Sequence, residues 1–153
     1  MSTEEHDRVR RSTAERINRE LDEKRLTQVA ELVGASPEEM TRRLEELDRE
    51  WDVERVLEAN AATVTLVSMA LSTRSRWWLL LAGVVPAFLL QHALQGWCPP
   101  IEFFRRQGVR TRREIDAERT AIKALRGDFA DVKADPANAW SAAEQALAVA
   151  GRR

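Results

Sequence analysis

Cys98 is the residue with the clearest chemical potential, and it is the single cysteine of the 153-residue chain. It stands in the run Gly96-Trp97-Cys98-Pro99-Pro100, and two basic residues, Arg105 and Arg106, follow shortly after. Positive charge near a thiol favours the nucleophilic thiolate. Cys98 is therefore a candidate redox-sensitive or persulfide-accepting thiol. The alternative is that it serves as a small apolar residue in a tight turn.

The composition argues against metal-dependent and disulfide-dependent chemistry. One cysteine cannot form an internal disulfide, and no Cys/His cluster with the spacing of zinc ligands is present. We find no constellation of catalytic residues, and we expect no metal, no cofactor and no enzyme activity. The net charge is −1, so the chain as a whole does not attract nucleic acid or anionic lipid.

The segment from Leu26 to Ser36, running into the next helix, is similar to a helix-turn-helix. A recognition helix presents basic or amide side chains to base edges from its first turn. This helix instead presents Glu38 and Glu39, which repel phosphate. We interpret the pair as a site of protein contact and do not expect nucleic-acid binding. The predicted partner face consists of four apolar residues at helical spacing, Met40, Leu44, Leu47 and Trp51.

Two windows of the chain carry no charge, Ala59 to Thr73 and Trp77 to Trp97. A helix of about 20 apolar residues crosses the roughly 30 Å core of a bilayer. The second window has this length, and its predicted membrane-interface anchors are Trp77, Trp78 and Trp97. The first window spans only about 22 Å, so it must lean on its neighbour. The alternative is that both windows are buried helices of a soluble bundle.

Helices pack in lipid through small and hydroxyl side chains that let their backbones approach. The residues predicted to form this contact are Ala61, Thr65, Ser68 and Ser72 on the first helix, and Gly83 and Ala87 on the second. The second helix also contains Gln91 and His92, and lipid penalises such polar groups. We interpret them as lying one turn from the interface and as bonded to the first helix or to water.

Basic residues predict the orientation of the hairpin. The connector Arg74-Ser75-Arg76 carries two arginines, and the outer flanks carry more, so both termini are expected to be cytosolic. The first residues have no apolar run after their charges, so no signal peptide is expected. Five arginines just past the second helix are predicted to contact lipid headgroups: Arg105, Arg106, Arg110, Arg112 and Arg113.

The regions that flank the hairpin have the pattern of helices. Capping boxes begin at Ser36 and at Thr111, where a glutamate follows three residues later. Apolar residues are sparse from Val9 to Leu21, which indicates a solvated or partner-dependent helix. No segment alternates with period two, so the fold class is all-α: a two-helix transmembrane hairpin flanked by amphipathic cytosolic helices. The expected regions are residues 1–52, 53–108 and 109–153.

Residues 53–128 resemble the YgaP-like transmembrane domain, a family of small bacterial inner-membrane hairpins of unknown function. The resemblance is carried by Asp52-Val53-Glu54-Arg55 before the first apolar helix, the short basic connector, and Gly96-Trp97-Cys98-Pro99 followed by Gly108. The family pattern has an apolar stretch before the last glycine, whereas this chain has Glu102, Arg105 and Arg106 there. The resemblance implies a membrane location and helix-mediated dimers, and it implies no reaction.

We therefore expect a non-enzymatic protein of the bacterial inner membrane. Its hairpin anchors the chain in membrane lipid and forms homo-oligomers, while residues 26–57 dock a cytosolic protein partner through the apolar face. Two other functions stay open at this point. One is a membrane-tethered regulator that uses the helix-turn-helix, and the other is a sulfur or redox carrier that uses Cys98.

Overall fold

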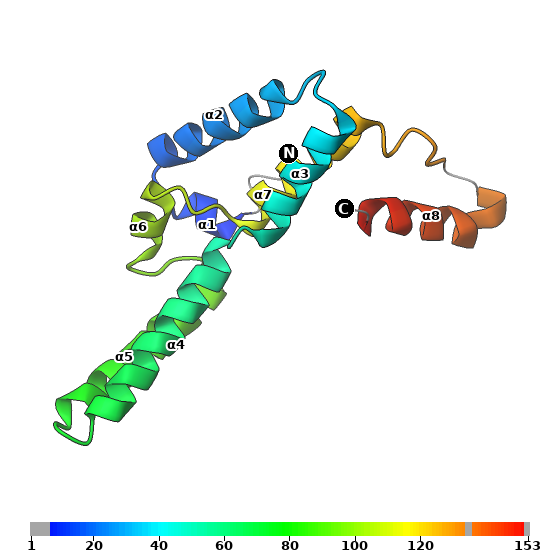
Figure 1. Cartoon of the computed structure of the whole chain (residues 1–153). Helices are drawn as coiled ribbons and strands as arrows, with labels where there is room; N and C mark the ends of the chain where they lie inside the picture. Colours follow the sequence, from blue (N-terminus) through cyan, green and yellow to red (C-terminus); the bar gives the residue numbers. More distant parts are fainter. Residues whose placement is uncertain (1–6, 134–135, 152–153) are drawn as a thin grey trace. The chain divides into compact units, whose positions relative to one another are not determined.

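The computed structural model describes residues 7–133 and 136–151, and these residues form helices without any strand (Figure 1). The all-α class is confirmed. The first six residues, part of the segment for which no signal peptide is expected, lie outside this range. The elements are α1 (Arg8–Arg11), α2 (Glu15–Glu31), α3 (Pro37–Arg49), α4 (Val53–Leu71), α5 (Trp77–Gln95), α6 (Ile101–Arg106), α7 (Arg112–Arg126), η2 (Pro136–Asn138) and α8 (Ala139–Gly151).

Both predicted capping boxes are confirmed. The Ser36 hydroxyl accepts from the N–H of Glu39 at 3.2 Å, and the Glu39 carboxylate accepts from the N–H of Ser36 at 2.9 Å. At the start of α7, the N–H of Thr111 donates to Glu114 Oε2 at 2.8 Å, and the N–H of Glu114 donates to Thr111 Oγ1 at 3.3 Å. These bonds satisfy backbone donors that the first turn of a helix leaves unpaired.

The chain divides into two compact units. Unit 1 comprises Met1–Glu23 and Trp51–Glu114, and unit 2 comprises Lys24–Glu50 and Ile115–Arg153. Each unit therefore combines segments that are distant in sequence, which differs from the three consecutive regions expected above. The physical reason is that apolar residues of the N-terminal and C-terminal segments pack against residues from the middle of the chain, and together they form the two cores.

In unit 1, α4 and α5 pack side by side as an antiparallel pair joined by the connector at residues 72–76 (Figure 1). The predicted packing residues of α4 and its C-cap are half-buried, except Ser68, which is 1% exposed; they are Ala61, Thr65, Ser68 and Ser72. On α5, the prediction that Gly83 and Ala87 form the contact with α4 is wrong. Both are exposed, and nothing lies within 4 Å of a Cβ built at Gly83.

The withdrawn side of α5 is made by other residues, which recur three or four positions apart: Ala82, Val85, Leu89 and His92. This spacing is that of one helix face, and the larger side chains fill the contact with α4. Gly83 and Ala87 therefore stand on a different face. Homo-oligomerisation through the hairpin stays a prediction from the sequence.

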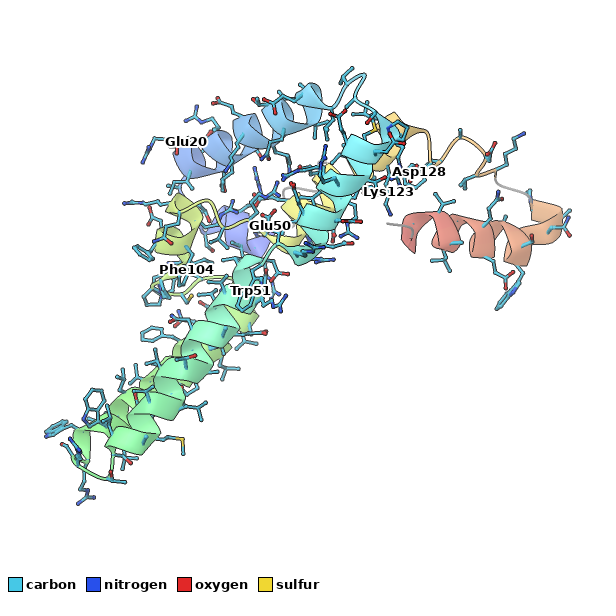
Figure 2. All side chains as sticks on the ribbon, viewed as in Figure 1. Glu20, Glu50, Trp51, Phe104, Lys123 and Asp128 are labelled. Atoms are coloured by element: carbon cyan, nitrogen blue, oxygen red, sulfur yellow. The ribbon has the colours of Figure 1, made fainter. Side chains whose placement is uncertain are left out.

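Among the described residues, α5 is the one helix long and apolar enough to cross a membrane, and only 6% of its apolar window is buried. Helix α4 has the same length but begins with charged residues, Glu54, Arg55 and Glu58. Figure 2 shows side chains standing out from both sides of the pair. The exposed large apolar side chains of α5 after its tryptophans are Leu79, Leu80, Leu81, Val84, Phe88, Leu90 and Leu94.

The core of unit 2 uses the apolar face of α3. Met40, Leu44 and Leu47 are 6%, 1% and 0% exposed, and they pack with Ile115 and Ile122 of α7. The prediction that these three residues dock a cytosolic partner is therefore wrong, because α7 of the same chain already covers them. The fourth, Trp51, is 47% exposed and belongs to unit 1.

This core makes a testable prediction. Leu44→Ala leaves a cavity, and we expect it to lower the free energy of unfolding of unit 2 by about 2 to 5 kcal/mol. Hydrogen exchange of α3 and α7 in the detergent-solubilised chain measures this loss. Leu26→Ala is the matched control, because Leu26 is 70% exposed and its truncation should change exchange little. Equal protection in the two variants would contradict the assignment of Leu44 to a core.

Candidate functional site at the base of the hairpin

The N-terminal segment forms part of the core at the base of the hairpin. Val9 of α1 is 4% exposed and packs with four buried residues of α4, α6 and the loop between α5 and α6, which are Val53, Leu57, Cys98 and Ile101. The sequence indicated that the segment after Val9 is solvated or depends on a partner. The structure supplies that partner from within the chain, since the hairpin base packs on the segment.

Gly96 lets the N-terminal segment approach the end of α5. Its φ is +77°, a left-handed conformation that ends the helix, and a Cβ built there would lie 2.4 Å from Cβ of Arg8. From this position Arg8 Nη1 donates to the carbonyl oxygen of Ala93 at 2.8 Å. A cation at the carbonyl end of a helix is favoured because the helix dipole is negative there.

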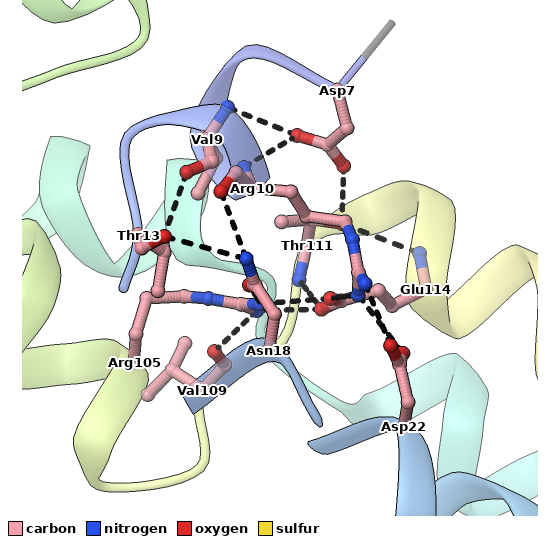
Figure 3. Close-up of polar contacts among 10 residues, drawn as sticks. All are labelled: Asp7, Val9, Arg10, Thr13, Asn18, Asp22, Arg105, Val109, Thr111 and Glu114. Atoms are coloured by element: carbon pink, nitrogen blue, oxygen red, sulfur yellow. Dashed lines mark hydrogen bonds and ion pairs between the residues drawn. The ribbon is translucent and has the colours of Figure 1, made fainter. Parts of the chain in front are cut away.

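Glu114 lies at the centre of a buried ion-pair cluster in unit 1 (Figure 3). Its Oε2 accepts from Arg105 Nη1 at 2.5 Å, and its Oε1 accepts from Arg105 Nη2 at 2.8 Å. Arg10 Nη1 donates to the same Oε1 at 2.5 Å. The two-point contact with Arg105 is the geometry in which arginine and carboxylate bind most strongly. One carboxylate thus joins α1, α6 and the start of α7.

Other donors of the cluster have partners as well, whereas Nε of Arg105 is buried without a hydrogen bond. Arg10 makes two further contacts with Asp22, at 2.9 and 2.7 Å, and Arg105 Nη2 donates to Asn18 Oδ1 at 2.9 Å. The hydroxyl of Thr111 donates to Asp7 Oδ2 at 2.7 Å. Figure 3 shows these residues converging from both ends of unit 1's sequence. The cluster is therefore a network of hydrogen bonds and ion pairs that fixes the N-terminal segment to the base of the hairpin.

The electrostatics of the cluster favour the charged forms. Burial alone raises the pKa of Glu114, but the hydrogen bonds and the charge of Arg105 outweigh it, so the pKa lies below the ordinary value of 4.5. Arg105 is 1% exposed, and a buried charge of this kind is stable only when it is paired. In the described part of the chain, no three His, Cys, Asp or Glu side chains gather to hold a metal ion.

The cluster corrects the predicted set of headgroup contacts. Arg105 and Arg110 are 1% and 6% exposed, so the prediction that their guanidinium groups reach lipid headgroups is wrong. Arg106, Arg112 and Arg113 are exposed and stay candidates, with Arg106 paired to Glu102 at 2.8 Å. The sequence treated the five arginines as one group because spacing alone does not reveal which of them face the core.

The surroundings of Cys98 do not activate its thiol. The side chain is 3% exposed within the apolar core, and burial raises the pKa of the thiol above its ordinary value despite a backbone hydrogen bond involving Ile101. A thiol in such a place is mostly protonated and shielded from substrates. The structure thus favours the interpretation of Cys98 as a small apolar residue in a turn.

The tryptophans predicted as interface anchors are all solvent-accessible. Trp77 and Trp78 are 77% and 38% exposed at the start of α5, and Trp97 is 43% exposed just past its end. They therefore lie at opposite ends of the apolar helix, and their role as anchors stays a prediction.

Trp51 precedes α4 (Figure 2), and the guanidinium of Arg55 lies 4.3 Å from its ring centroid, a cation–π contact.

These features define the class of the chain as all-helical, with an apolar helical hairpin whose base contains a buried salt-bridge cluster. Comparison with known families adds one finding. Residues 52–114 match the family described as inner membrane protein YgaP-like, transmembrane domain, so this segment is similar to that family. The match covers less than half of the chain and ends at Glu114, where unit 1 also ends. No curated protein and no solved structure matches the chain.

The approach of Arg8 to Gly96 makes a prediction. Gly96→Ala combines strain at φ +77° with a Cβ that overlaps Arg8, so we expect residues 7–23 to lose their protection from hydrogen exchange. Gly108→Ala is the matched control, because Gly108 also has a positive φ, +91°, but nothing lies within 4 Å of its Cβ position. If both variants behave alike, backbone strain alone explains the effect and the contact with Arg8 has no role.

The lowered pKa of Glu114 makes a second prediction. A carboxylate whose folded pKa lies below its unfolded value stabilises the fold above the unfolded value, and this stabilisation is lost as the pH falls through the folded pKa. Unit 1 should therefore lose stability as the pH falls below about 4.5. Glu114→Gln leaves the buried Arg105 without its carboxylate partner, while Arg10 keeps Asp22, so it should cost roughly 3 to 5 kcal/mol at pH 7 and weaken the acid dependence.

Thermal unfolding of the detergent-solubilised chain at pH 3 to 7, read by tryptophan fluorescence, measures both effects. Asp116→Asn is a control at the next acidic residue of α7, which is less buried than Glu114. A Glu114→Gln profile that has the midpoint and pH dependence of the wild type would show that the cluster does not stabilise unit 1.

Proposed function

We propose that the chain is a non-enzymatic anchor protein of the bacterial inner membrane, in which the hairpin holds the helical unit 2 at the cytosolic face. The observation that carries the proposal is the surface of α5. This helix has 19 residues without an acidic or basic side chain other than His92, and the chain leaves its large apolar side chains exposed. The YgaP-like family match supports the membrane location.

Water is a poor solvent for this surface. Each Leu, Val or Phe in a membrane-spanning helix contributes about −0.3 to −0.6 kcal/mol to insertion. The exposed members of this set, such as Leu80, Val84 and Phe88, gain this free energy in lipid and would promote aggregation in water. Pro86 and the polar pair Gln91 and His92 reduce the total, and the contact of α5 with α4 compensates for part of that loss.

Helix α4 fits the same arrangement as the member of the pair with the shorter uncharged segment. After Glu58 it continues without charge to Leu71, which is 13 residues or about 20 Å. Two of its hydroxyl side chains avoid unpaired contact with lipid in different ways. Thr63 Oγ1 donates to the carbonyl oxygen of Ala59 at 2.7 Å, whereas Ser68 is buried away from lipid, with its Oγ lacking a hydrogen bond. These features support a hairpin in which α5 contributes most of the insertion free energy.

The orientation follows from basic residues near the two ends of the hairpin. The connector carries Arg74 and Arg76, whereas the flanks carry more arginines, and arginine-rich flanks stay on the cytosolic side. The arginines of the flanks are Arg42, Arg43, Arg49, Arg55, Arg105, Arg106, Arg110, Arg112 and Arg113. The proposal is therefore that both termini, and unit 2 with them, are cytosolic.

The test of the anchor is a charge in the middle of α5. Val84→Arg should cost about 3 kcal/mol of insertion free energy, because arginine at the centre of a spanning helix is strongly unfavourable. We expect the wild type to resist carbonate extraction from membranes and to need detergent, whereas much of the Val84→Arg protein should be extracted or degraded. Leu26→Arg, at an exposed position of α2, is the control that should remain in the membrane.

The same membranes test the orientation. With Ser75→Cys as the only cysteine, on a Cys98→Ser background, an impermeant maleimide should label the connector in intact spheroplasts. Release of the wild type by carbonate, or labelling of residue 75 only after the membrane is broken, would refute the anchor or its orientation respectively.

A further inference from the structure

Unit 1 contains a cavity of about 770 Å³ beside the base of the hairpin. Helix α5 contributes its apolar wall, which includes Pro86, Leu89, Leu90 and Ala93. This volume lies within the range of roughly 300 to 1,000 Å³ that is typical of small-molecule sites. The apolar wall requires that an occupant have an apolar part as well as any polar one.

Charges of both signs line the rest of the cavity. Glu54 and Glu58 stand one helical turn apart on α4 and therefore share a face, while Arg8 comes from α1 and Arg113 from the first turn of α7. Arg8, Arg113 and Glu58 are exposed, so their charges are accessible to a ligand. A ligand with one sign of charge satisfies half of this lining, whereas a zwitterion satisfies both halves.

The cavity also contains polar atoms that lack partners. His92 lines the cavity and is 7% exposed, and its Nδ1 is buried without a hydrogen bond. Glu54 is another lining residue, and its Oε2 is also buried without a hydrogen bond. Buried polar atoms without partners cost free energy, and they are rare in folded proteins unless a water, ion or ligand satisfies them. A polar occupant of the cavity that reached these two atoms would satisfy them.

We propose that this cavity binds a phospholipid whose headgroup carries both a phosphate and a primary amine, as in phosphatidylethanolamine. The phosphate accepts from Arg8 and Arg113, the ammonium group donates to Glu58, and an acyl chain leaves along Leu89 and Leu90. The proposal rests on the membrane placement proposed above, because the charged end of a membrane hairpin lies at the level of the headgroups. It goes further by naming a particular lipid chemistry.

The test uses the full-length chain in detergent micelles doped with one lipid at a time, and native mass spectrometry counts the lipids retained. We expect one phosphatidylethanolamine per chain, retained at about tenfold lower lipid concentration than phosphatidylglycerol. The latter has the phosphate but no amine, so it loses the charge-assisted hydrogen bonds to Glu58.

Two variants separate the halves of the headgroup. Glu58→Gln should reduce retention of phosphatidylethanolamine about tenfold and leave that of phosphatidylglycerol unchanged, whereas Arg113→Gln should weaken both. Glu58→Asp should keep the preference, which excludes a general loss of folding. Glu45→Gln on α3 and Arg76→Gln in the connector are exposed controls that do not line the cavity, and they should change neither lipid.

Equal retention of the two lipids by the wild type, or an unchanged preference in Glu58→Gln, would overturn the proposal. Soluble glycerophosphoethanolamine is a separate arm: if it displaces the lipid at equal concentration, the ligand is a free phosphate ester and the lipid assignment is wrong. Flotation with vesicles reads the membrane placement independently. A chain that prefers phosphatidylethanolamine in micelles but does not float contradicts the anchor and not the cavity.

Discussion

The buried charge of Arg105 is the constraint that organises unit 1. A guanidinium that is 1% exposed must be neutralised within the protein, and Glu114 does this with both carboxylate oxygens. The same carboxylate caps α7 through Thr111 and reaches Arg10, so helix initiation, the closure of the hairpin base and the attachment of the N-terminal segment depend on one residue. The family segment also ends at this residue.

In this arrangement, the base of the hairpin and the outer face of α5 differ in what surrounds their side chains. At the base, charged groups are buried with their partners, and Val9 completes an apolar core around Leu57 and Ile101. Along α5, apolar side chains face outward with no cover from the described residues. A salt-bridge cluster at the end of an uncovered helix pair is what a membrane hairpin needs, because the lipid holds the helices and the cluster fixes their end. The cavity beside His92 is lined by charged residues of the base and by apolar residues of α5.

The sequence predicted features that depend on local rules, and it failed where tertiary contacts decide. The capping boxes at Ser36 and Thr111 were predicted correctly because they need only the right residues three apart. The apolar stripe of Leu44 was found, but its partner is α7, which periodicity cannot identify. The burial of Arg105 had no local signal, because its partner Glu114 already had an explanation as a cap. Gly83 was assigned to the packed face because small residues suit close contact, yet larger side chains fill that contact.

The central claim, that lipid surrounds the outward face of α5, is tested most directly by spin labels placed singly along this helix in vesicles. On a Cys98→Ser background, labels at Val84 and Phe88 should collide often with oxygen, which concentrates in lipid, and rarely with a water-soluble nickel chelate. Labels at the packed positions Val85 and Leu89 should be shielded from both. High nickel accessibility at Val84 and Phe88, or shielding there equal to that at Val85, would contradict the account.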